Sequence, residues 1–128
     1  MEGRLNMSSG TKWEDVVGYS RAVRIGNVIE VSGTVAVEGD KIISENDAYG
    51  QTKYILEKIG KVIEETGGSI LDVVRTRMFV TDISKWQDIG KAHGEFFKDI
   101  KPVTTMVEVS SLISLGLLVE IEATAIIN

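Results

Sequence analysis

Alternating apolar and polar residues predict strands in the first third and in the last half of the chain. Residues 20–25 and 28–37 alternate on either side of Gly26-Asn27, a two-residue sequence typical of a tight hairpin turn. The same alternation predicts further strands at residues 41–44, 73–81, 103–109 and 117–127.

Two segments between these strands show apolar residues at helical spacing. The first helix is expected to begin at a cap provided by Asn46 or Asp47 and to end at Gly67-Gly68, since glycine adopts the left-handed conformation at little cost. The second is expected to begin at Ser84 and to end before Pro102, which disfavours helical geometry in the residue before it. The two apolar stripes are Ile55, Leu56, Ile59, Val62 and Ile63, and Trp86, Ile89, His93, Phe96 and Ile100.

The resulting order, βββ-α-β-α-ββ, predicts an α+β fold. Two helices of this length cover only one face of such a sheet. The strand at residues 73–81 nevertheless offers apolar side chains to both faces, Val73 and Phe79 to one and Val74, Met78 and Val80 to the other. A soluble monomer rarely exposes an apolar face of that size, so we predict a homo-oligomer that buries it.

Length and composition narrow the possible functions. The 128 residues, 43% of them hydrophobic, suffice for one domain over residues 1–128, in which residues 1–16 lack periodicity and form a lead-in segment anchored by Trp13. The net charge of −5 argues against a nucleic-acid partner, and the absence of cysteine excludes disulfides and thiolate chemistry. Residues 1–18 are polar and no apolar run approaches membrane-spanning length, so we expect a soluble, cytoplasmic protein with no membrane partner.

Charged residues on the predicted strands are the first candidates for chemistry. Glu120 and Glu122 lie two apart on one strand and share a face, as do Arg75 and Arg77 on another. For Glu122 and for Glu108 we favour a cross-strand ladder of opposite charges. For Glu120, a role in acid–base catalysis stays open as an alternative.

The sole histidine, His93, falls on the apolar stripe of the second helix, where a half-buried packing role is favoured over a catalytic one. No second histidine and no cysteine accompany it, so a metal site is not expected. Gly90 and Gly94 lie four apart on the same helix, a spacing typical of close backbone approach. The glycines elsewhere do not form a nucleotide-binding loop.

Several segments resemble those of a known protein family in their order and spacing. They are GYSRAVRIGN, VSGTVAV, VVRTRMFVTDISKWQDIGKAHGEFF, PVTTMVEVSSL and LVEIEATAI. With these segments, residues 18–126 resemble the reactive intermediate deaminase family (RidA, formerly YjgF). The resemblance implies a chorismate-mutase-like fold, a homotrimer whose sheets form a central barrel, and a small-molecule cleft at each subunit boundary. It also implies hydrolysis of 2-imino or enamine acids to 2-keto acids and ammonia, with no cofactor or metal.

The resemblance carries over position by position. It implies that Glu120 positions the attacking water and that Tyr19 shapes the pocket. The matching positions for substrate binding are the turn Ser32 and Gly33, the helix residue Gly90, and Met106, whose backbone amide remains available. The family arginine that grips the substrate carboxylate is replaced by Thr104. Arg21 shares a face with Tyr19 and, like Arg24, is a candidate to compensate.

Three functions follow. The first is a RidA-type hydrolase whose substrate range is altered or reduced, because threonine offers one neutral hydrogen bond where arginine offers two charge-assisted ones. The second is a non-catalytic metabolite-binding trimer of the same fold. The third, an endoribonuclease or translation inhibitor, is disfavoured by the acidic net charge.

Overall fold

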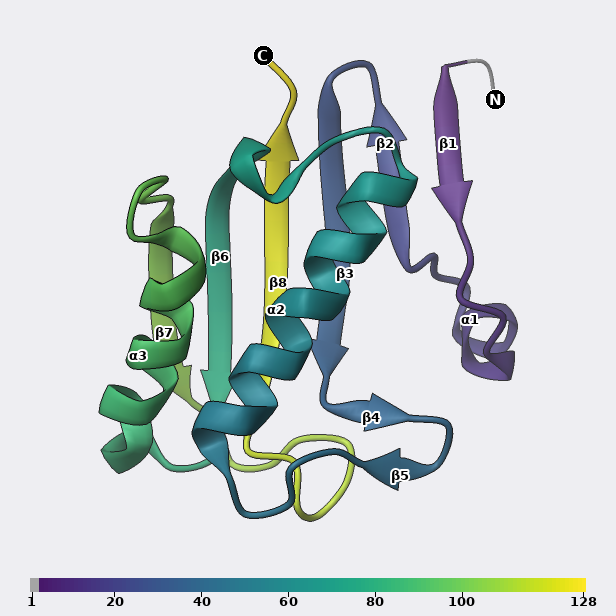
Figure 1. Ribbon diagram of the computed structural model, residues 1–128. Coiled ribbons are helices and arrows are strands. Elements are labelled where there is room, and N and C mark those ends of the chain that lie inside the picture. Colours follow the sequence, from purple (N-terminus) through teal and green to yellow (C-terminus); the bar gives the residue numbers. More distant parts are fainter. Residues whose placement is uncertain (1–2) are drawn as a thin grey trace.

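The computed structural model describes residues 3–128, which form a mixed six-stranded sheet with two long helices on one face (Figure 1). Within residues 3–128, only the pair of β6 (Val73–Val80) and β7 (Val103–Glu108) is parallel, and every other neighbouring pair in this sheet is antiparallel. A small hairpin of β4 (Val37–Glu38) and β5 (Lys41–Ile42) follows β3 (Val28–Val35). In spatial order, the sheet consists of β1 (Arg4–Met7), β2 (Ala22–Ile25), β3 (Val28–Val35), β8 (Val119–Ile126), β6 (Val73–Val80) and β7 (Val103–Glu108). The α+β prediction is confirmed.

Helix α2 (Ala48–Glu65) crosses the middle of the sheet, and α3 (Trp86–Phe97) lies beside it over β6 and β7 (Figure 1). Of the two predicted caps for α2, Asp47 performs the role, because its side chain accepts from the Gly50 amide at 2.9 Å. The prediction that Ser84 caps the other helix is wrong. The Asp82 carboxylate instead accepts from the Ser84 amide at 3.0 Å and starts a 3₁₀ turn, Ile83–Lys85, that leads into α3.

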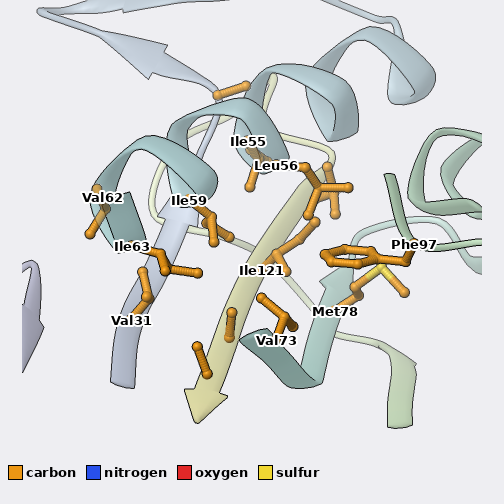
Figure 2. Packing of buried hydrophobic residues seen from close by; sticks show 14 of the residues in the cluster. Val31, Ile55, Leu56, Ile59, Val62, Ile63, Val73, Met78, Phe97 and Ile121 are labelled. Carbon is orange, nitrogen blue, oxygen red and sulfur yellow. The ribbon is translucent and has the colours of Figure 1, made fainter. Parts of the chain in front are cut away.

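The core fills the space between the helices and the sheet (Figure 2). Ile55, Ile59 and Ile63 of α2 and Ile121 of β8 are fully buried there. Burying an aliphatic side chain of this size contributes about 1.5–3 kcal/mol relative to leaving it exposed. Every second residue of β8 faces this core, which places the residues between them on the opposite face.

Strict alternation of side chains along β6 assigned Val73 and Val74 to the wrong faces of the sheet. The register between β6 and β8 shifts between Val73 and Arg75, and this irregularity turns Val73 toward the helices. Val73 therefore joins Met78 and Val80 in the core, whereas Val74, at 40% exposure, lies on the uncovered face with Phe79. The prediction that both faces carry apolar residues is confirmed, with these two valines exchanged.

The predicted lead-in segment is a folded part of the domain. Strand β1 pairs with β2 at the edge of the sheet and is followed by a short helix, α1 (Lys12–Val17). Trp13 does not anchor it, since the side chain is 57% exposed. Glu14 does so instead: it is 6% exposed and accepts from the Ser9 amide at 3.0 Å. The hydrogen bonds from Ser9 hold the pKa of Glu14 below its ordinary value.

The sheet face opposite α2 and α3, here called the open face, is not covered by any helix within residues 3–128 apart from α1 at its edge. None of the helices in this same part of the chain is both long enough and apolar enough to span a membrane. Apolar side chains remain exposed on the open face, among them Val74, Val103, Val107 and Ile126. The predicted oligomer would bury them.

Candidate ligand-binding site

The candidate site centres on Glu120, which lies on the open face where β3 and β8 pair irregularly. The register between these strands shifts between Val31 and Thr34, so Ser32 and Gly33 form a local irregularity opposite β8. A Cβ atom built on Gly33 would collide with Oε2 of Glu120. The missing side chain at Gly33 therefore provides the space that the carboxylate occupies.

Glu120 is half-buried, and burial is the main reason that its pKa lies above the ordinary value. Repulsion from Glu122 raises the pKa of Glu120 further, and the positive charge of Arg21 opposes both effects. A carboxyl group with a raised pKa exchanges protons closer to neutral pH than an ordinary one does. Glu120 thus has the electrostatic surroundings of an acid–base group.

Arg21 is hydrogen-bonded to the same irregular segment. Its Nη2 donates to the Gly33 carbonyl at 2.8 Å, while its buried Nε has no hydrogen-bond partner within residues 3–128. The side chain of Arg24, the other candidate to compensate for the missing arginine, donates to the Thr66 and Gly26 carbonyls at 2.8 and 2.9 Å, near the end of α2. Of the two, only Arg21 contributes its charge to the surroundings of Glu120.

Tyr19 and Ser32 border an open depression of about 750 Å³ next to this cluster. The Ser32 hydroxyl donates to the Ser20 carbonyl at 2.9 Å, which fixes the serine at the rim, and Tyr19 is 39% exposed. The lining of the depression is mainly polar and includes Glu30, Arg77 and Glu122. Glu120 is absent from this lining, so the depression does not enclose the carboxylate.

The remaining predicted residues lie elsewhere. Thr104 and Met106 on β7 pair with Thr76 and Met78 of β6, whose side chains face the helices. They are therefore on the opposite side of the sheet from Glu120, and β6 separates β7 from β8. Gly90 is on α3, and a Cβ atom there would meet nothing within 4 Å in the described chain. One copy of the chain does not bring the eight predicted residues together.

The other predicted carboxylates have structural roles. Glu122 forms the expected ladder with Arg77 on β6, at 3.6 Å between Nη1 and Oε1, and both side chains are partly exposed. Such a pair contributes only a fraction of a kcal/mol, about 0.2–1. The ladder predicted for Glu108 is wrong, because Glu108 pairs with Val80 on the helix-covered side and accepts from the Ile83 amide at 2.9 Å.

One polar connection was missed from the sequence. His93 packs its ring on Phe97, with ring centroids 4.6 Å apart, as a half-buried packing residue does. Its Nε2 also lies 2.8 Å from the hydroxyl oxygen of Thr76. That oxygen in turn lies 2.7 Å from the hydroxyl oxygen of Thr104. The residues come from three separate elements, so no local sequence signal links them.

Comparison with known proteins agrees with this fold. The family model described as Endoribonuclease L-PSP matches residues 10–127, and the chain belongs to this family. A YjgF/YER057c/UK114-family structure from Mycobacterium tuberculosis has a TM-score of 0.88 at 47% identity, covering 97% of this chain and 99% of that one. An uncharacterized protein of Streptomyces coelicolor is 37% identical, covering 93% and 89% of the two chains. A RutC family protein of Pyrococcus abyssi is 34% identical over 84% of each.

Proposed function

We propose that this protein is a cofactor-free hydrolase of small imines and enamines, with a substrate range altered because Thr104 replaces the carboxylate-binding arginine. In the reaction, the oxygen of water adds to the carbon of the C=N bond. The carbon–nitrogen bond then breaks, and the 2-imino acid becomes a 2-keto acid plus ammonia. The atoms balance without an oxidant or reductant, so side chains that move protons and stabilise charge suffice.

The observation that carries this proposal is the half-buried carboxyl of Glu120 beside Gly33, with its raised pKa. In this role Glu120 takes a proton from the attacking water as it adds and returns one to the departing nitrogen. Arg21 supports the carboxylate form and supplies positive charge for an anionic substrate. Tyr19 and Ser32 border the approach to the site from the neighbouring depression.

The complete site requires a second copy of the chain under this proposal. Glu120 is on the open face, whereas Thr104, Met106 and Gly90 belong to the helix-covered side and its edge. We therefore propose a homotrimer in which one copy brings its open face to the β7 edge of the next. The exposed apolar residues of the open face support such an association, because burying them is favourable.

A non-catalytic metabolite-binding trimer is the second candidate. Thr104 favours it, since a neutral hydroxyl holds a substrate carboxylate less firmly than a guanidinium does. An endoribonuclease activity, suggested by the description of the family, fits less well with a net charge of −5 per chain. The first two candidates predict different results with the same preparation of protein.

The decisive experiment is a coupled assay with freshly generated 2-iminopropionate and 2-iminobutyrate. Wild-type protein should accelerate formation of the keto acid weakly, and Glu120→Gln should abolish the acceleration. Glu57→Gln, the same change at an exposed position of α2, should retain most of it. An equal rate for wild type and Glu120→Gln would overturn the proposal. Binding of 2-oxobutyrate without any turnover would favour the metabolite-binding alternative, and robust wild-type turnover would show that Thr104 does not limit the reaction.

A further inference from the structure

Three side chains form a hydrogen-bonded series that runs from the helix layer to the edge of the sheet. His93 on α3 is joined through its Nε2 to the hydroxyl of Thr76 on β6, and that hydroxyl is joined to the hydroxyl of Thr104 on β7. Thr76 is completely buried, whereas Thr104 is exposed. The series thus connects a half-buried imidazole to the hydroxyl of an exposed residue on the edge strand.

The parallel register of β6 and β7 sets this geometry. Thr76 and Thr104 are direct partners in the ladder, so their side chains leave the sheet on the same side. The imidazole of His93 lies over this side, held by its contact with the Phe97 ring. The hydroxyl of Thr76 has no other side-chain or backbone partner within residues 3–128.

The buried hydroxyl of Thr76 has one proton, and within residues 3–128 only His93 or Thr104 can accept it. Leaving this proton unpaired is costly, so the direction of one hydrogen bond in the series sets the direction of the other. When Nε2 of His93 carries the hydrogen, it donates to Thr76, and Thr76 donates to Thr104. The hydroxyl proton of Thr104 is then free to point outward. When Nδ1 carries the hydrogen, Thr76 donates to Nε2 and Thr104 donates to Thr76, which leaves only a lone pair of Thr104 directed outward.

We propose that His93, acting through Thr76, is a positioning residue that decides whether Thr104 donates or accepts a hydrogen bond at the ligand site. The inference rests on the proposed function in that Thr104 belongs to that site. With the hydrogen on Nε2, Thr104 donates to an acceptor oxygen of the ligand, such as one from a carboxylate or a carbonyl group. A ligand of this chemistry selects the Nε2–H tautomer.

The state of the imidazole suits this role. Burial lowers the pKa of His93, and no charged side chain within residues 3–128 adds to that effect. The ring is therefore neutral near pH 7, and a neutral imidazole can hold its hydrogen on either nitrogen. Nδ1 makes no hydrogen bond to a protein group in the described part of the chain. The hydrogen bond between Nε2 and Thr76 therefore determines which ring nitrogen carries the hydrogen.

The first test needs no ligand, and the sole histidine makes it unambiguous. Nitrogen NMR of ¹⁵N-labelled protein reports the tautomer of His93 directly. In Thr104→Val, Thr76 loses the acceptor for its proton and must donate to Nε2, so the Nε2–H population should fall relative to wild type. The matched control is Thr105→Val, since Thr105 pairs with Arg77 on the opposite side of the sheet and should leave the tautomer unchanged.

The second test adds 2-oxobutyrate, the keto acid that the proposed reaction releases. In wild type it should increase the Nε2–H population and raise the pKa of His93, and in Thr104→Val it should do neither. An unchanged His93 spectrum in Thr104→Val without ligand, or binding of 2-oxobutyrate with no response of His93, would overturn the inference. Failure of 2-oxobutyrate to bind would count against the proposed function, whereas the ligand-free comparison would still decide the coupling.

Discussion

Oε2 of Glu120 occupies the volume that a side chain at Gly33 would need. The two residues come from neighbouring strands whose register shifts at this point, so the glycine and the carboxylate fit each other only through the fold. The same irregular segment holds Arg21 through the Gly33 carbonyl. Gly33 therefore leaves room for the Glu120 carboxylate. Through its carbonyl it also holds the Arg21 guanidinium nearby.

Gly33→Ala should test this relationship. The new Cβ atom collides with the far end of a flexible side chain, so Glu120 can move aside and the melting temperature should change little. Turnover should fall by about 100-fold, a loss typical of a catalytic group displaced by about 1 Å. Gly94→Ala, where a Cβ meets nothing within 4 Å, should keep wild-type activity. Equal activity of both variants would contradict the placement of Glu120.

Glu120→Gln should change how stability depends on pH. Because the pKa of Glu120 is raised above its ordinary 4.5, the folded protein binds this proton more tightly than the unfolded chain. The stability supplied by protonated Glu120 is complete at acid pH and is lost as pH rises through the folded pKa. Urea unfolding should therefore show Glu120→Gln gaining stability relative to wild type as pH rises. Glu57→Gln, the same change at an exposed helix position, is the control for the loss of one negative charge.

The periodicity of α2 and β8 was sufficient to predict these elements and most of the core, because each buries one regular face. The shift in β6 was not predictable, since a bulge changes which residues face the core without changing composition. The prediction that residues 1–16 form a lead-in segment failed for a different reason. Strand β1 is a short edge strand with exposed side chains, and only its pairing with β2 identifies it.

The candidate site was only partly accessible from sequence. The proximity of Gly33 and Glu120 follows from the pairing of β3 with β8, which no local pattern encodes. The separation of Glu120 from Thr104 depends on the parallel register of β6 and β7 and on the sheet order. The resemblance supplied these residues as one set, and the fold divides that set between two faces.

Thr104→Arg should restore turnover of simple amino-acid imines. Thr104 is exposed on an edge strand, so a longer side chain can be accommodated there, although its bond to Thr76 is lost. A charge-assisted hydrogen bond contributes about 1.5–3 kcal/mol, which corresponds to a gain of about tenfold or more in kcat/KM. The control is Thr104→Val, which also breaks the bond to Thr76 but adds no charge and should show no gain. No gain at position 104 would mean that further residues have diverged.

Gly60→Ala should stabilise the protein. Gly60 is inside α2, where glycine costs about 0.5–1 kcal/mol relative to alanine. The nearest atom to the new Cβ is Cδ1 of Ile70 at 3.5 Å, an ordinary packing distance. Urea denaturation should show an increase of about that size in the free energy of unfolding, with an unchanged slope. A decrease would mean that the packing between α2 and Ile70 has no room for a methyl group.

Val74→Glu should separate the copies of the chain if the open face is the interface between them. Val74 is on that face at 40% exposure, and a buried, unpaired carboxylate opposes association strongly. Light scattering should give the mass of a trimer for wild type and of a single chain for Val74→Glu. Leu71→Glu, altered at a 70% exposed position of the 3₁₀ helix Ile70–Asp72 before β6, should remain trimeric.

Val74→Glu also tests whether assembly can be lost without loss of the fold, and whether catalysis depends on assembly. Circular dichroism should be unchanged in Val74→Glu, since the core behind β6 is intact, while turnover should disappear because Glu120 no longer meets the β7 edge of another copy. A monomeric Val74→Glu that retains full activity would place the whole site within one chain. That result would remove Thr104 from the site and would leave Arg21 as the principal cation beside Glu120.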